Sequence, residues 1–124
     1  MSAARYHHID PAVLMRSVAG DLDAFRSLSQ VYLAIAPPAL ARMRAARAAG
    51  DARALAHESH ALKGSSMLVG AQALCALLQR IELLAGAGGD CAALWPELEP
   101  QFGQVMEEVS DSIVHYTGQA GAGA

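Results

Sequence analysis

Apolar residues recur every three or four positions along most of the chain, which is the spacing that places side chains on one face of an α-helix. The pattern predicts a short helix that begins at Asp10-Pro11 and ends near Gly20. Four longer helices follow, within residues 21–50, 51–70, 74–85 and 102–116. The run of glycine and alanine at 86–89 reads as a loop.

Aspartates stand where three of these helices should begin, since a short acceptor side chain caps the first free amides of a helix. They are Asp10, Asp21 and Asp51. Asp90 is a further possible cap, but Pro96 and Pro100 obscure the start of the last helix. Pro37-Pro38 interrupt the second helix, and we expect them to kink it or restart it.

The apolar stripes supply the expected core. In the first long helix the stripe contains Leu22, Phe25, Leu28, Ser29, Tyr32, Leu33 and Ile35, and it resumes at Leu40, Met43 and Ala46. In the second it contains Leu55, Leu62, Ser66 and Val69. Short connections make neighbouring helices antiparallel. The predicted fold is all-α: an antiparallel up-down-up-down four-helix bundle with a short additional N-terminal helix. It spans residues 9–117, between a flexible leader at 1–8 and a disordered tail at 118–124.

The composition is typical of a small helical domain, and it argues against several functions. Hydrophobic residues make up 53% of the 124 residues and aromatic residues only 5%. The net charge of −3 has interspersed signs and no basic stripe, which disfavours nucleic-acid binding. No apolar run is long enough to span a membrane, and residues 1–10 lack the apolar segment of a secretion signal. We therefore expect a cytoplasmic protein in which Cys75 and Cys91 are reduced packing residues.

The stretch 57–70 combines a packing stripe with polar residues of another kind. His60 lies about 160° from Leu62 around the helix, so it should face solvent. Lys63, Gly64 and Met67 follow at offsets of three, four and seven residues, on the same exposed side. A cation, an open space and an adaptable apolar contact around a histidine suit a site that accepts a phosphoryl group from a partner. An inert surface histidine is the alternative interpretation.

Other chemistry does not fit this spacing. His57 and His60 are three residues apart, whereas the zinc-protease pattern places its second histidine four residues after the first, where this chain has Ala61. The run 63–66 lacks the order of a phosphate-binding loop. Its two serines have no implied general base, so they read as small packing residues.

The run His60-Ala61-Leu62-Lys63-Gly64-Ser65-Ser66, followed by Gly70-Ala71, Leu74, Leu77 and Glu82, resembles the signature of histidine-containing phosphotransfer (HPt) domains. The upstream positions Asp21, Phe25, Pro37, Leu40, Gly50-Asp51 and Leu55 fit the same family, so the resemblance covers about residues 9–116. It implies a four-helix bundle with an exposed phosphorylated histidine, here His60. It also implies that Lys63 lies beside this histidine and that Gly64 lets the partner approach. Ala61 replaces the threonine that the family often has.

The resemblance also implies a supporting residue on the next helix. Glu82 is the first candidate: by accepting from Nδ1–H of His60, it would leave Nε2 as the nucleophile. Gln79, one turn earlier, is the other candidate, and an ordinary solvated glutamate is the alternative for Glu82. For docking we expect Met67 and the outward faces of the first two helices, with Leu14, Val18 and Asp21 as candidates. Packing of the short helix is the alternative for Leu14 and Val18.

The implied function is relay of a phosphoryl group between aspartates of receiver domains, in response regulators and hybrid histidine kinases. No carboxylate cluster suits Mg²⁺, so we expect no cofactor or metal in this chain and a Mg²⁺ ion on the receiver. No nucleotide-binding motif is present, so we expect a phosphocarrier without kinase activity of its own. The second hypothesis is a helical adaptor that binds receiver or kinase domains without carrying phosphate. A metal or haem bundle is third, since the apolar stripes offer no inward-facing ligands.

Overall fold

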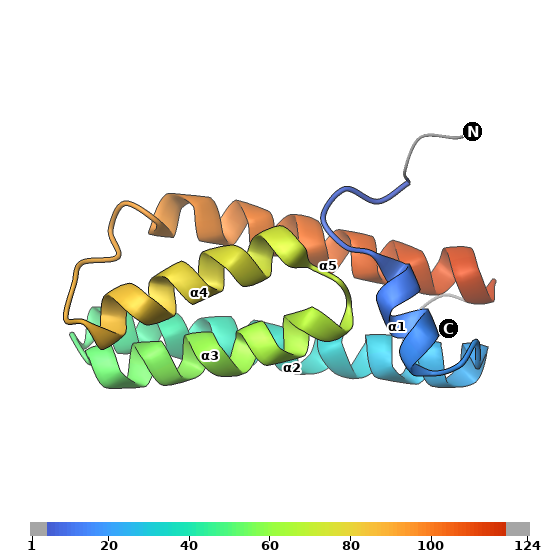
Figure 1. Cartoon of the computed structure of the whole chain (residues 1–124), viewed down its shortest axis with the longest axis horizontal. Coiled ribbons are helices and arrows are strands. Elements are labelled where there is room, and N and C mark those ends of the chain that lie inside the picture. The colour runs from blue at the N-terminus through green and yellow to red at the C-terminus, as the bar shows by residue number, and fades with distance from the viewer. Residues whose placement is uncertain (1–4, 119–124) are drawn as a thin grey trace.

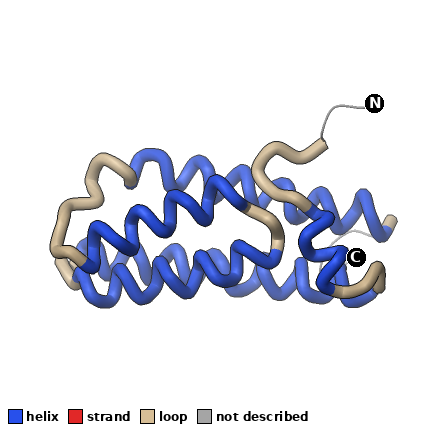
Figure 2. Tube along the Cα trace, viewed as in Figure 1, coloured by secondary structure: helices blue, strands red, loops and turns tan. Residues whose placement is uncertain are grey.

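A computed structural model describes residues 5–118 of the chain. Its helices are α1 (Pro11–Ser17), α2 (Leu22–Ala48), α3 (Ala52–Leu68), α4 (Gln72–Gly86) and α5 (Trp95–Thr117). Helices α2 to α5 run alternately up and down the long axis, joined by short loops (Figures 1 and 2). No strand occurs within the described range. The predicted fold, a four-helix bundle with a short N-terminal helix, is confirmed.

The lengths of the helices explain the place of α1. With 27 and 23 residues, α2 and α5 are longer than α3 and α4, which have 17 and 15. The turn between α3 and α4 therefore lies short of one end of the bundle, and α1 fills the space beyond it (Figure 1). Leu14 of α1 is 1% exposed there.

The predicted helix starts are confirmed where an aspartate caps them. The side chains of Asp10, Asp21 and Asp51 accept hydrogen bonds from the amides of Ala12, Ala24 and Ala54 at 3.0, 3.1 and 3.0 Å. Asp90 instead accepts from Ala92 N–H in the loop before α5, which begins without a side-chain cap.

Of the two effects predicted for the prolines, a restart of the second helix is excluded, because α2 continues through Pro37 and Pro38, and the kink stays a prediction. The prolines deprive the carbonyls of Leu33 and Ala34 of their usual intrahelical donors. Both proline rings lie on the exposed side of α2, while Ala36, Ala39 and Leu40 next to them are buried. Packing of these neighbours holds the helical path despite the missing hydrogen bonds.

The core stripe of α2 is also narrower than predicted. Phe25, Ser29 and Tyr32 are buried, whereas Leu28 and Ile35 are 41% and 45% exposed. Leu22 is exposed as well. The stripe predicted for the next helix is confirmed: Leu55, Leu62 and Ser66 of α3 are buried, and so is Val69 directly after it.

Two buried serines connect α3 to the helices on either side. The hydroxyl of Ser59 donates to the backbone carbonyl of Leu78 in α4 at 2.6 Å. The hydroxyl of Ser66 shares a hydrogen bond of 2.8 Å with the phenol of Tyr32 in α2. Burial raises the pKa of Tyr32 to about 12, although the bond to Ser66 opposes the shift. These contacts fix α3 between α2 and α4, the helices against which it mainly packs.

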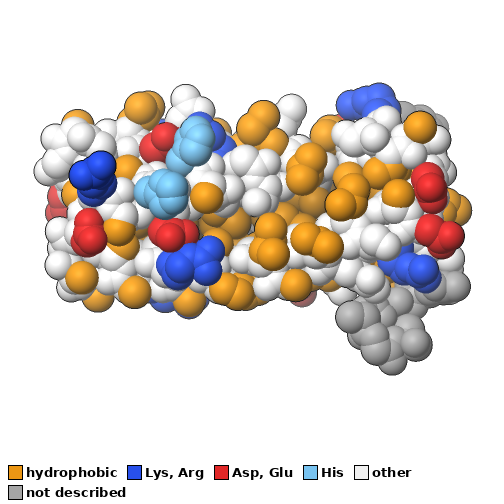
Figure 3. All heavy atoms as spheres, turned by 90° about the horizontal axis from the view of Figure 1, so that it is seen from below, with side chains coloured by type: hydrophobic (Ala, Val, Ile, Leu, Met, Phe, Trp, Pro, Cys, Tyr) orange, Lys and Arg blue, Asp and Glu red, His pale blue; other side chains and the backbone are white. Residues whose placement is uncertain are grey.

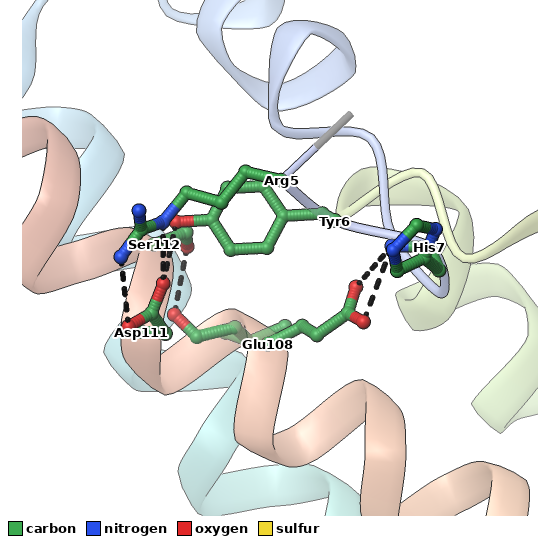
Figure 4. Close-up of polar contacts among 7 residues, drawn as sticks. Arg5, Tyr6, His7, Glu108, Asp111 and Ser112 are labelled. Atoms are coloured by element: carbon green, nitrogen blue, oxygen red, sulfur yellow. Dashed lines mark hydrogen bonds and ion pairs between the residues drawn. The ribbon is translucent and has the colours of Figure 1, made fainter. Parts of the chain in front are cut away.

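Residues 5–9, here called the N-terminal strap, lie along α5. The carboxylate of Glu108 accepts hydrogen bonds from the backbone amides of His7, His8 and Ile9, at 3.0, 2.8 and 3.2 Å to Oε1. Figure 4 shows this carboxylate directed at His7. One side chain thus satisfies three successive N–H groups that would otherwise lack a helical or strand partner. Because Glu108 is about a hundred residues away in sequence, the strap closes the N-terminus onto the last helix.

A second carboxylate on α5 holds the start of the strap. Asp111 accepts from the Arg5 guanidinium at 3.0 Å and from the Tyr6 hydroxyl at 2.8 Å (Figure 4). Burial and the bond to Asp111 raise the pKa of Tyr6 to about 12. The flexible leader expected at 1–8 thus has its described part, residues 5–8, in contact with α5. Residues 1–4, and 119–124 of the expected tail, lie outside the described range.

The turn between α3 and α4 is held against the start of α1. The amide of Asp10 donates to the carbonyl of Val69 at 3.2 Å. Gly70 follows with a positive φ of 68°. A Cβ atom at this position would lie 2.6 Å from the carbonyl oxygen of Asp10. Glycine is therefore required here both for its backbone conformation and for the close approach of α1.

Candidate functional site

His60 lies near the middle of α3 on its solvent side, as predicted. Its side chain is 66% exposed, whereas Leu62 on the opposite face is 1% exposed. Figure 3 shows histidine side chains on the face formed by α2 and α3, beside several hydrophobic groups. The helical spacing of apolar residues therefore predicted correctly that the His60 side chain faces solvent.

One carboxylate from α4 reaches both polar residues of the site. Glu82 Oε2 lies 2.9 Å from His60 Nδ1, and Glu82 Oε1 accepts from Lys63 Nζ at 3.2 Å. Desolvation raises the pKa of Glu82, but the hydrogen bond from Lys63 and the charges of His60 and Lys63 outweigh it. The net pKa lies below the ordinary 4.5. Glu82 is thus ionised near neutral pH.

This geometry assigns the tautomer of the histidine. An ionised carboxylate can only accept, so Nδ1 of His60 carries the proton that it donates to Glu82. In the neutral ring the lone pair is then on Nε2. The site consequently presents a nucleophilic nitrogen, Nε2, on an exposed ring. The hydrogen bond from Nδ1 to Glu82 fixes the orientation of this ring.

Open space lies one turn along from the imidazole. A Cβ atom added to Gly64 would meet no atom of the described residues within 4 Å, so no contact within residues 5–118 requires a glycine there. Glycine nevertheless lowers helix stability by about 1 kcal/mol relative to alanine. A bare backbone beside His60 lets another molecule approach closely.

Of the two predicted partners for His60, the structure selects Glu82. Gln79 is exposed, and no hydrogen bond among the described residues joins it to His60. Gln79 instead lines a shallow groove between α3 and α4, with Lys63, Met67, Cys75 and Val13. Cys75 donates its thiol hydrogen to the carbonyl of Lys63 at 3.5 Å, and burial raises its pKa.

The residues predicted to contact a partner differ in their exposure to solvent. Met67 is 60% exposed and borders the groove next to Lys63. The docking role predicted for Leu14 is wrong, because this side chain is buried beneath α1. Val18 is half-buried, and the exposed carboxylate of Asp21 is engaged as the cap of α2.

Sequence reasoning missed an apolar part of this surface. Leu28, Val31 and Ile35 of α2 and Leu68 of α3 are between 41% and 50% exposed. Figure 3 shows hydrophobic side chains along the face that these helices form. The signal was present in the sequence: Leu28, Val31 and Ile35 form a stripe of helical spacing beside the buried one. The predicted core stripe wrongly included Leu28 and Ile35.

Two kinds of feature do not occur in the part of the chain that the structure describes. Within residues 5–118, no three His, Cys, Asp or Glu side chains form a group that could hold a metal ion. The expectation that the chain needs no cofactor stays a prediction. Over the same residues, no helix has the length and hydropathy needed to span a membrane.

Comparison with known proteins gives a family and one solved structure. The family model of the Hpt domain matches residues 27–112. The crystal structure of histidine-containing phosphotransfer protein B (HptB) from Pseudomonas aeruginosa PAO1 is similar, with a TM-score of 0.79 and 28% sequence identity. The match covers 92% of this chain and 99% of that chain. The comparison with curated proteins gives no match.

Proposed function

The chain belongs to the Hpt domain family, and from this we propose that it is a histidine phosphotransfer protein of a two-component phosphorelay. In this proposal His60 accepts a phosphoryl group from the aspartate of one receiver domain and passes it to another. The observation that carries the proposal is the bond from His60 Nδ1 to Glu82, since it leaves Nε2 unprotonated on an exposed ring.

The proposed step is an in-line displacement at phosphorus. The lone pair of His60 Nε2 forms the N–P bond while the O–P bond of the acyl phosphate breaks, and its electrons return to the aspartate carboxylate. The ring gains positive charge and Nδ1 keeps its proton, against the carboxylate of Glu82 at 2.9 Å. Transfer to the next receiver reverses these bond changes.

Lys63 and Gly64 support this step in different ways. The Lys63 ammonium lies one turn from His60 and offers positive charge to the phosphoryl oxygens. Gly64 leaves room for the receiver backbone. Because the transition state is loose, positioning and charge neutralisation account for most of the catalysis. We expect the Mg²⁺ ion that assists the step to be bound by the receiver.

The partner in this proposal is a receiver domain of a response regulator or hybrid histidine kinase. It would cover His60 together with Met67 and the exposed apolar side chains of α2 and α3. Side chains of this kind, half exposed around a polar centre, are typical of protein-docking surfaces. A cytoplasmic location accords with such partners and stays a prediction.

The test is transfer from receiver domains phosphorylated on aspartate. Wild-type protein should acquire an acid-labile, base-stable phosphate on His60, identified by mass spectrometry, and His60→Gln should acquire none. Label that persists in His60→Gln would overturn the proposal. Tight binding of receivers by the wild type without transfer would instead support the adaptor, the second hypothesis from the sequence. His57→Gln is a matched control on the same helix, because no polar contact joins His57 to Glu82.

A further inference from the structure

The residue before the candidate phosphorylation site points in the opposite direction, into the bundle. Ser59 is 0% exposed, and its hydroxyl donates to the carbonyl of Leu78 in α4 at 2.6 Å. This is a short hydrogen bond between two helices in an apolar interior, where few groups compete for either partner. It therefore fixes the local position of α4 relative to α3.

The carbonyl of Leu78 belongs to the helical turn that carries Glu82. In an α-helix the amide of residue i bonds to the carbonyl of residue i−4, so the amide of Glu82 is directed at the same Leu78 oxygen. Ser59 thus holds one end of this turn while the carboxylate of Glu82, at its other end, meets the ring of His60. The two contacts with α4 come from adjacent residues of α3.

A second contact of the same kind runs in the opposite direction. The thiol of Cys75 in α4 donates to the carbonyl of Lys63 in α3 at 3.5 Å. Together, this contact and the bond from Ser59 lie on either side of His60 along α3, at Lys63 and Ser59, and both meet α4 before Glu82. Sliding or rotation of either helix would have to break one of these contacts.

We propose that Ser59 is a positioning residue for phosphotransfer: it fixes the α4 turn that keeps Glu82 on Nδ1 of His60, and thereby keeps Nε2 as the reactive nitrogen. The inference rests on the proposed function, but it also makes a claim about the free protein that needs no partner. Ser59 touches neither the phosphoryl group nor the reacting nitrogen, so it acts only through Glu82.

The chain offers a matched control in Ser66. This serine is also on α3 and also 0% exposed, but its hydroxyl bonds to Tyr32 of α2. Ser59→Ala and Ser66→Ala therefore remove the same group from the same helix and break contacts on opposite sides of it. Both should lower stability, and only Ser59→Ala should disturb the bond between His60 and Glu82.

The first measurement is the ¹⁵N NMR spectrum of the His60 ring in the unphosphorylated protein. Wild type and Ser66→Ala should show the Nδ1–H tautomer as the main species, and Ser59→Ala a clear increase of the Nε2–H form. The second is the rate of transfer from a phosphorylated receiver, which should fall about fivefold in Ser59→Ala, the size expected from loss of one ordinary hydrogen bond. In a Glu82→Gln background the same change should have little further effect.

Three results would overturn the proposal: an unchanged His60 tautomer in Ser59→Ala, equal loss of transfer in both serine variants, or an undiminished Ser59→Ala effect in the Glu82→Gln background. If the proposed function is wrong, neither the wild type nor any variant will receive phosphate from a receiver domain. The NMR spectrum of the unphosphorylated protein would still show whether Ser59→Ala changes the tautomer of His60.

Discussion

Glu82 Oε2 lies 2.9 Å from Nδ1 of His60, on the side of the ring away from Nε2. The carboxylate also binds Lys63, so the proposed nucleophile and the nearby cation share one acceptor. A group transferred to Nε2 therefore arrives at a ring whose other nitrogen already faces a negative charge. This arrangement favours the charged form of the ring that the proposed phosphorylation would create.

Replacing Glu82 by glutamine keeps an acceptor near Nδ1 but removes the charge. We expect the yield of phosphorylated His60 at equilibrium with a receiver to fall about fivefold, because an exposed charge pair of this kind contributes about 1 kcal/mol. The ratio of phosphohistidine to phosphoaspartate after mixing measures the change. Gln79→Ala is the matched control on α4 and should leave the ratio unchanged. An equal ratio in wild type and Glu82→Gln would contradict this role for the charge.

The same carboxylate should make stability depend on pH. The pKa of Glu82 in the folded protein lies below its ordinary value of 4.5, so folding favours the ionised form. Its contribution is complete above pH 4.5 and is lost as the pH falls through the lower folded-state pKa. We expect the difference in unfolding free energy between wild type and Glu82→Gln to shrink over this acidic range. Urea unfolding at a series of pH values tests this, and a difference that grows toward acid would contradict it.

Gly64→Ala should raise the stability of the free protein and slow phosphoryl transfer. No atom lies within 4 Å of the added Cβ, so the change should stabilise the free protein by about 0.5–1 kcal/mol. The methyl group would project beside His60 and should slow transfer by hindering the receiver. Gly103 in α5 is the matched control, since it also has open space around it. Gly103→Ala should raise the melting temperature similarly without slowing transfer; equal transfer by both variants would exclude a steric role for position 64.

Glu108→Ala should release the N-terminal strap. Three amides lose their acceptor, and we expect a loss of about 1–2 kcal/mol in unfolding free energy. Hydrogen exchange at His7, His8 and Ile9 should accelerate before that of α5. Glu107→Ala, on the exposed side of the same helix, should change neither quantity. Unaltered protection of the three amides in Glu108→Ala would show that the strap is held by other contacts.

Local rules were enough for most of the fold. The caps at Asp10, Asp21 and Asp51 and the outward direction of His60 depend on residues within one or two turns, and the sequence shows these directly. The exposed stripe with Leu28 was misassigned because two apolar stripes lie side by side on α2, and spacing does not say which one meets the other helices.

The remaining features depend on contacts between distant segments. Glu82 and Gln79 are one turn apart on α4, and only the rotation of α4 against α3, fixed in part by Ser59, decides which one reaches His60. The strap on Glu108 joins residues about a hundred positions apart, and no periodic pattern marks such a pairing.

Gly70 follows His60 by ten residues and is not part of the candidate site. A genetic screen for loss of signalling should nevertheless recover substitutions at this position. Any side chain at this position would press on the backbone of Asp10 and lift α1, and Val13 of α1 lines the groove beside Met67. Such a mutant would keep an intact His60 and still present a misshapen surface. A map of sensitive positions for this protein would therefore include a residue that sets the shape of the proposed docking surface without contacting the phosphoryl group.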